Sequence, residues 1–73
     1  MKEVREVWLG VKGGGQDASV RQTIFLSTDG CKGMLTECHI TGDDSAHPGA
    51  WMFRLSDPVY PNRWHWEMEL VVE

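Results

Sequence analysis

The fold is decided by one stretch of alternating residues, Arg63-Trp64-His65-Trp66-Glu67-Met68-Glu69-Leu70-Val71-Val72-Glu73. Every second side chain in it is apolar, and these side chains are Trp64, Trp66, Met68, Leu70 and Val72. A two-residue period places them on one face of a β-strand, whereas a helix would distribute them around its circumference. We therefore expect residues 63–73 to form a strand with one buried face and to have His65 on the opposite, polar face.

Other segments of the chain also have the composition of short strands bounded by turn residues. They are residues 4–11, which end before the glycines at 13–15, and residues 20–28, 34–41 and 50–56. Val, Ile, Thr and aromatic residues suit a pleated surface, and clusters of Gly, Asp, Asn and Pro separate the segments. This spacing predicts an all-β domain of about five antiparallel strands, closed into a small barrel or packed as a two-layer sandwich.

An alternative fold class is α+β, with a short helix around residues 18–27. Ser19 is followed three residues later by Gln22, which resembles the capping box at the start of a helix. We favour the strand, because Thr23, Ile24 and Phe25 suit a sheet better than a short helix.

The turn at Asp29-Gly30 is expected to join the second and third strands into a hairpin. An odd-length loop gives one mostly apolar face, whereas a two-residue loop mixes polar and apolar groups on both faces. The pairs expected from the odd loop are Val20 with Ile40, Gln22 with Cys38, Ile24 with Thr36, and Leu26 with Met34.

Size and charge limit the classes of function. A chain of 73 residues is one domain, residues 1–73, and seven basic against eleven acidic residues give a net charge of −4. This charge repels phosphate backbones, so we expect no nucleic-acid partner and no binding to anionic membranes. The chain has no apolar run of membrane-spanning length and no secretory signal, so we expect a cytoplasmic protein with reduced cysteines.

The cysteines and histidines form no spacing specific to a reaction. Cys38 and His39 are neighbours in a strand and project to opposite faces, so they cannot act as a nucleophile and its base. We expect Cys38 to lie in the core and Cys31, in a loop, to be the more exposed thiol. The separation of the two cysteines along an extended strand argues against a disulfide between them. We therefore assign no catalytic residue.

Residues 39–47 contain a cluster of candidate metal ligands. His39, Asp43, Asp44 and His47 could present imidazoles and carboxylates to a divalent ion, but their spacing matches no zinc signature. A solvated acidic loop is the simpler interpretation. We expect no metal site and no cofactor.

Trp8 lies opposite Val7 and Leu9 in the first predicted strand, and we expect it to share a second aromatic face with Phe25 and Leu35. An aromatic face of this kind is typical of a protein interface or a ligand groove, and a two-fold dimer would cover it. The sequence thus favours a non-enzymatic β module that binds itself as a homodimer or binds another protein.

The alternative function is a small-ligand binder, or a small oligomeric enzyme, with a pocket at a subunit interface. Such a pocket would combine Trp8 or Trp51 with a histidine, and the three candidates are His39, His47 and His65.

Overall fold

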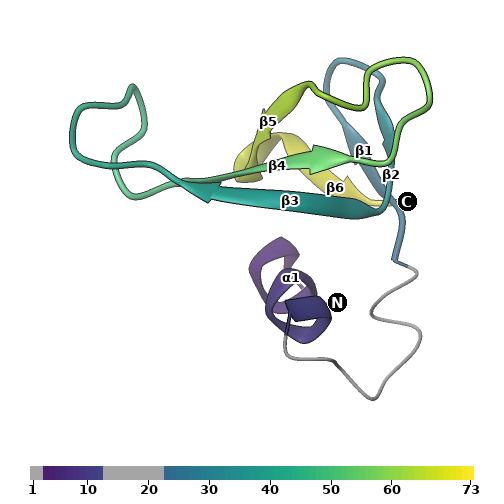
Figure 1. Cartoon of the computed structure of the whole chain (residues 1–73), viewed down its shortest axis with the longest axis horizontal. Helices are drawn as coiled ribbons and strands as arrows, with labels where there is room; N and C mark the ends of the chain where they lie inside the picture. The colour runs from purple at the N-terminus through teal and green to yellow at the C-terminus, as the bar shows by residue number, and fades with distance from the viewer. Residues whose placement is uncertain (1–2, 13–22) are drawn as a thin grey trace.

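The computed structural model describes residues 3–12 and 23–73. Within these residues, one short helix packs against two small antiparallel sheets, which stay open and do not close into a barrel (Figure 1). The elements are α1 (Val4–Lys12), β1 (Phe25–Ser27), β2 (Lys32–Gly33), β3 (Leu35–Ile40), β4 (Trp51–Leu55), β5 (Trp64–Trp66), the 3-10 helix η1 (Glu67–Glu69) and β6 (Leu70–Val72). One sheet has the order β2-β1-β6 and the other has the order β3-β4-β5. The predicted antiparallel, mostly β architecture is confirmed.

The helix α1 replaces the first predicted strand, so the prediction of a strand over residues 4–11 was wrong. Val4 and Val7 are 9% and 2% exposed, whereas Leu9 is 58% exposed. Residues three or four positions apart lie on the same side of a helix, so Val4, Val7 and Trp8 face the sheets together. The prediction failed because alternate apolar positions were given more weight than this spacing.

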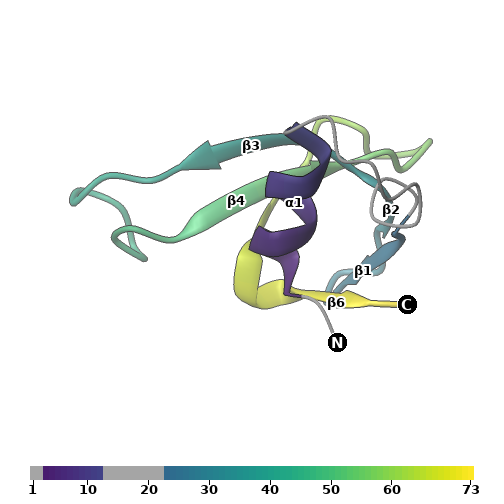
Figure 2. The same ribbon diagram turned by 90° about the horizontal axis from the view of Figure 1, so that it is seen from below.

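The core lies between α1 and the inner faces of the two sheets. Figure 2 shows α1 crossing β3 and β4, with η1 and β6 beside its N-terminal part. The buried cluster consists of Val4, Val7, Phe25, Cys31, Leu35, Phe53, Leu55 and Leu70. The Trp8 ring packs edge-on against Phe53 with 5.9 Å between ring centroids, and the Trp51 ring lies 6.3 Å from the same residue. Both tryptophans thus extend a core that is centred on Phe53.

The two middle strands were predicted well. β3 and β4 lie inside the predicted strands 34–41 and 50–56 and pair antiparallel, with Cys38 opposite Phe53 and Ile40 opposite Trp51. Phe53 and Leu55 are fully buried and Trp51 is partly buried. Alternation along β4 therefore identified its core-facing side correctly.

The stretch 63–73 is not one strand, and this prediction was wrong. It forms β5, turns through η1, and continues as β6 in the other sheet. The turn changes which side chains face the core: His65 is 1% exposed and Leu70 is 7% exposed, whereas Met68 is 58% exposed. A continuous strand would keep one set of side chains inside throughout. Because of the three-residue turn η1, the core-facing side chains before it and after it do not belong to one alternating series.

The tryptophans of β5 are half-buried on the face opposite His65. The guanidinium of Arg54 lies 4.5 Å from the centroid of the Trp64 ring, and the His47 ring lies 4.7 Å from the Trp66 ring. Both rings are therefore partly covered by polar side chains instead of by the core.

The predicted hairpin register was also wrong. β1 pairs with β2, with Phe25 opposite Gly33 and Leu26 opposite Lys32, and β3 pairs with β4 in the other sheet. The chain changes sheets at Gly33, where a Cβ would lie 2.6 Å from Ser56 Oγ and 2.9 Å from its backbone nitrogen. Close approach of the two backbones thus requires glycine at this corner.

Residues 20–22 of the second predicted strand lie outside the described residues, as do residues 18–22 of the alternative helix. Residues 23 and 24 have no regular structure, and residues 25–27 form β1 and not a helix.

Candidate functional site

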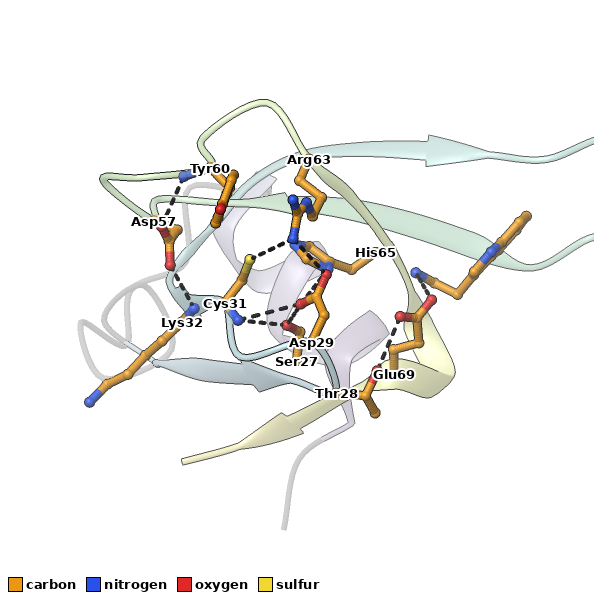
Figure 3. A network of polar contacts seen from close by, with 11 residues as sticks. Ser27, Thr28, Asp29, Cys31, Lys32, Asp57, Tyr60, Arg63, His65 and Glu69 are labelled. Atoms are coloured by element: carbon orange, nitrogen blue, oxygen red, sulfur yellow. Dashed lines mark hydrogen bonds and ion pairs between the residues drawn. The ribbon is translucent and has the colours of Figure 1, made fainter.

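A polar cluster lies where the loop between β1 and β2 meets β5 (Figure 3). His65 and Cys31 are 1% and 2% exposed, whereas Asp29 is exposed. The His65 Nδ1 atom lies 3.7 Å from Asp29 Oδ1, and Arg63 Nη1 lies 3.2 Å from Asp29 Oδ2. The same arginine nitrogen lies 4.0 Å from the Cys31 sulfur. An acid, a thiol, an imidazole and a guanidinium thus meet in one place.

The loop that carries Asp29 and Cys31 is held by its own hydrogen bonds. The Ser27 hydroxyl donates to Asp29 Oδ1 and accepts from the Cys31 N–H at 2.9 Å. The Ser27 N–H donates to the Cys31 carbonyl at 2.9 Å, and Gly30 has a positive φ of 91°. Glycine adopts this conformation without a steric cost, so the loop can reverse and turn the Cys31 side chain inward.

The electrostatics keep Asp29 ionised and Cys31 protonated. The Ser27 hydrogen bond is the main reason that the pKa of Asp29 is well below its ordinary value. Burial is the main reason that the pKa of the Cys31 thiol is raised. A buried thiol with a raised pKa is a poor nucleophile, so the cluster does not have the properties of a cysteine-based catalytic site.

A second carboxylate, Asp57, fixes the connection that follows β4. It accepts backbone N–H groups from Lys32 at 3.1 Å, Val59 at 2.8 Å and Tyr60 at 3.0 Å. These hydrogen bonds, led by that of Tyr60, lower the pKa of Asp57. Asp57 therefore joins β2 to the loop that leads into β5 and Arg63.

The histidines predicted as ligand-pocket residues lie in three different environments. His39 is exposed on β3, 6.2 Å from the Trp64 ring, and His47 is exposed beside Trp66. Only His65 is buried, and the prediction that it faces away from the core was wrong. Trp51 lies beneath Arg5, whose guanidinium is 4.6 Å from the ring centroid.

The residues predicted for an interface converge on the core of the chain itself. Phe25 and Leu35 are 1% and 8% exposed, and Trp8 packs against the same buried cluster. Trp8 remains partly accessible on α1, at the border of that cluster. The helix therefore covers the aromatic face for which we expected a second subunit.

The burial of the two cysteines differs from the prediction. Cys31, predicted as the more exposed thiol, is buried, and Cys38, predicted as a core residue, is half-buried against the core. Neither cysteine forms a disulfide within the described residues. Cys31 is buried because its loop folds back under β5. The prediction assumed that a residue in a loop is exposed.

Among the described residues, one group of three side chains can present ligand atoms to a metal ion. It consists of Asp29, Cys31 and His65, whose ligand atoms all lie within 4.8 Å of one another. The candidate ligands in residues 39–47 form no such group. Sequence reasoning missed the trio because its members come from two elements and because His65 was placed on the wrong face.

A groove of about 590 Å³ lies between α1 and the η1–β6 segment. Its lining is mainly apolar and consists of Glu3, Val4, Arg5, Phe25, Glu67, Met68, Leu70, Val71 and Val72. Arg5 Nε donates to Glu67 Oε1 at 2.6 Å, and this hydrogen bond is the main reason that the pKa of Glu67 is lowered. Glu67 also accepts the Trp51 N–H at 2.7 Å, so the polar wall of the groove ties the helix to β4.

Comparison with protein-family models, with curated proteins and with solved structures gives no match. In the described part of the chain, neither α1, with nine residues, nor the three-residue η1 has the length and apolar character needed to cross a membrane.

Proposed function

We propose that this domain is a non-enzymatic association module, and that its partner is a second copy of itself bound along β6 and the adjoining groove. The observation that carries this proposal is an apolar surface beside an open strand edge. Met68, Val71 and Val72 are 58%, 59% and 38% exposed, and all three line the groove. Apolar surface of this kind on a small domain marks an interaction site.

The open edge belongs to β6, which is the outer strand of its sheet in the described residues. The Thr28 N–H donates to the Glu69 carbonyl at 3.2 Å, and the Glu73 N–H donates to the Ile24 carbonyl at 2.9 Å. Alternate residues of an antiparallel strand direct their backbone groups to opposite edges. Val72, which lies between these contacts, therefore directs its N–H and C=O away from β1, where another strand can pair.

A second copy suits this surface because it supplies the same edge and the same apolar side chains. Two β6 strands, one from each copy, would pair antiparallel about a two-fold axis near Val71. This pairing would join the β2-β1-β6 sheets of the two copies and cover Met68 and Val72 on both chains. Each copy has a net charge of −4, so the two copies repel one another. We therefore expect the dimer to be tighter at moderate salt than at low salt.

Sedimentation over a range of protein and salt concentrations tests the proposal, with Val71→Glu as the disrupting variant. Two glutamates near the axis add like charges to the interface, so the variant should remain monomeric where the parent chain dimerises. Ile40→Glu is the matched control, because Ile40 is 56% exposed and lies on β3 in the other sheet. A parent chain that stays monomeric at its highest soluble concentration, or equal effects of both variants, contradicts the proposal.

A second candidate function is the binding of a small apolar ligand in the same groove. The volume of about 590 Å³ supports it, because ligand sites commonly have about 300–1,000 Å³. The groove lies within one chain, and it uses neither Trp51 nor the histidines. Val72→Trp should fill the groove and abolish binding of a neutral apolar dye such as Nile red. Dye binding that Val72→Trp leaves unchanged excludes this candidate.

A further inference from the structure

The buried side chain of His65 has unsatisfied hydrogen-bonding groups. Neither of its ring nitrogens has a hydrogen-bond partner in the described residues, although the side chain is fully buried. The nearest acidic atom, Asp29 Oδ1, lies 3.7 Å from Nδ1, which is beyond hydrogen-bond distance. A buried polar group without a partner is costly, and native proteins rarely leave one unsatisfied.

The side chains around this imidazole are of types that can bind metal ions. Asp29, Cys31 and His65 offer one oxygen, one sulfur and one nitrogen, and these atoms lie within 4.8 Å of one another. In a tetrahedral zinc site the ligand atoms lie about 3.5 Å apart, given bonds of about 2.0–2.3 Å. Separations of up to 4.8 Å would have to shorten by up to about 1.3 Å for the three atoms to surround an ion. The loop of Asp29 and Cys31 and the strand β5 would hold the ion from two sides.

We propose that Asp29, Cys31 and His65 bind one divalent transition-metal ion, with zinc as the best match. Thiolate and imidazole ligands select zinc and related ions over magnesium and calcium, which prefer oxygen ligands. Three protein ligands leave a fourth position open, as in zinc sites that bind water. The side chain of Asp29 is 37% exposed, so solvent can reach the Asp29 side of the trio.

Binding exchanges a proton for the metal. The Cys31 sulfur forms a bond to the ion and its thiol proton passes to solvent, while His65 and Asp29 bind through lone pairs without a change in oxidation state. The 2+ charge of the ion is then balanced by the thiolate and the carboxylate. One of the two ring nitrogens of His65 thereby gains the partner that it lacks.

The positive charge of Arg63 disfavours binding of a metal ion, because its guanidinium contacts both Asp29 and Cys31. Its side chain is 41% exposed and stacks on Tyr60, 3.9 Å from the ring centroid, so it has a path outward toward solvent. Removing its charge should favour the metal. We therefore expect Arg63→Gln to bind zinc about tenfold more tightly than the parent chain.

Cobalt(II) added to the purified full chain tests the site directly, because a thiolate bound to cobalt gives an intense near-ultraviolet charge-transfer band. We expect that band at one ion per chain, its displacement by zinc, and a rise in the thermal midpoint with zinc. Cys31→Ser and His65→Gln should lose the band, whereas Cys38→Ser and His47→Gln, the matched controls outside the trio, should keep it.

The outcome does not depend on whether each variant folds. A parent chain without the band, or a band that Cys38→Ser abolishes, overturns the proposal. Circular dichroism of each variant without metal separates loss of ligands from loss of structure. If Cys31→Ser does not fold, the parent chain and the Cys38→Ser variant still decide the result.

Discussion

Replacement of Val7 by alanine, compared with the same replacement of Leu9, tests whether residues 4–12 form a helix packed on the sheets. Val7 is 2% exposed and belongs to the core, whereas Leu9 is 58% exposed. In the predicted strand these residues would share one buried face. In α1 they lie on different sides, so their sensitivities to substitution should differ.

The magnitude follows from what each substitution removes. Val7→Ala deletes two buried methyl groups, which are worth about 0.8 kcal/mol each, and the cavity that remains adds to the cost. The better helix propensity of alanine returns up to about 0.6 kcal/mol. We expect a net loss of about 1.5 kcal/mol for Val7→Ala and a change within about 0.5 kcal/mol for Leu9→Ala.

Urea unfolding followed by tryptophan fluorescence measures both variants, since Trp8 and Trp51 contact Phe53 in the core. For a domain of this size, about 1.5 kcal/mol corresponds to a fall of roughly 6–12 °C in the thermal midpoint. If Leu9→Ala costs as much as Val7→Ala, residues 4–12 do not pack as α1 does, and the reasoning is refuted.

Three further outcomes are expected. Gly33→Ala should lower the free energy of unfolding by about 1–3 kcal/mol, because its Cβ would lie 2.9 Å from the backbone nitrogen of Ser56; an unchanged urea midpoint would contradict this close approach. The lowered pKa of Asp57 means that its stabilisation is present above its unfolded pKa, near 4, and is lost as the pH falls toward its folded pKa. Asp57→Asn should therefore flatten the pH dependence of the thermal midpoint below about pH 4, and an unchanged acid profile would refute the role of its backbone hydrogen bonds. In the folded metal-free protein, Cys38 should react with a thiol reagent faster than Cys31, because Cys31 is buried. In denaturant, both cysteines should react without prior reduction. Equal reaction rates in the folded protein would contradict the burial of Cys31.

The sequence was sufficient where alternation continues through a whole element. β4 shows this, because Phe53 and Leu55 are buried as their spacing predicts and the strand pairs with β3 along five positions. In α1 the alternating pattern led to the wrong prediction of a strand. Val7 and Leu9 have the two-residue spacing of a strand, but Val4, Val7 and Trp8 have the spacing of a helix. Short apolar segments fit both periods, and contact with the sheets decides between them.

The stretch 63–73 shows a different limit. Its alternation is real, but η1 inserts a turn that no glycine or proline marks, and Leu70 pairs with Ser27 in the second sheet. His65 is buried as a result. No local signal places a histidine beside a cysteine 34 positions earlier in the chain, so the trio of Asp29, Cys31 and His65 can be found only from the fold.

Nuclear Overhauser contacts across residues 63–73 test the central claim most directly, which is that this stretch leaves one sheet, turns, and enters the other. The structure predicts cross-strand contacts of His65 with Phe53 and of Leu70 with Ser27, together with a buried His65 ring. Uninterrupted pairing of residues 63–73 with a single strand, or a His65 ring in contact with solvent, would contradict it.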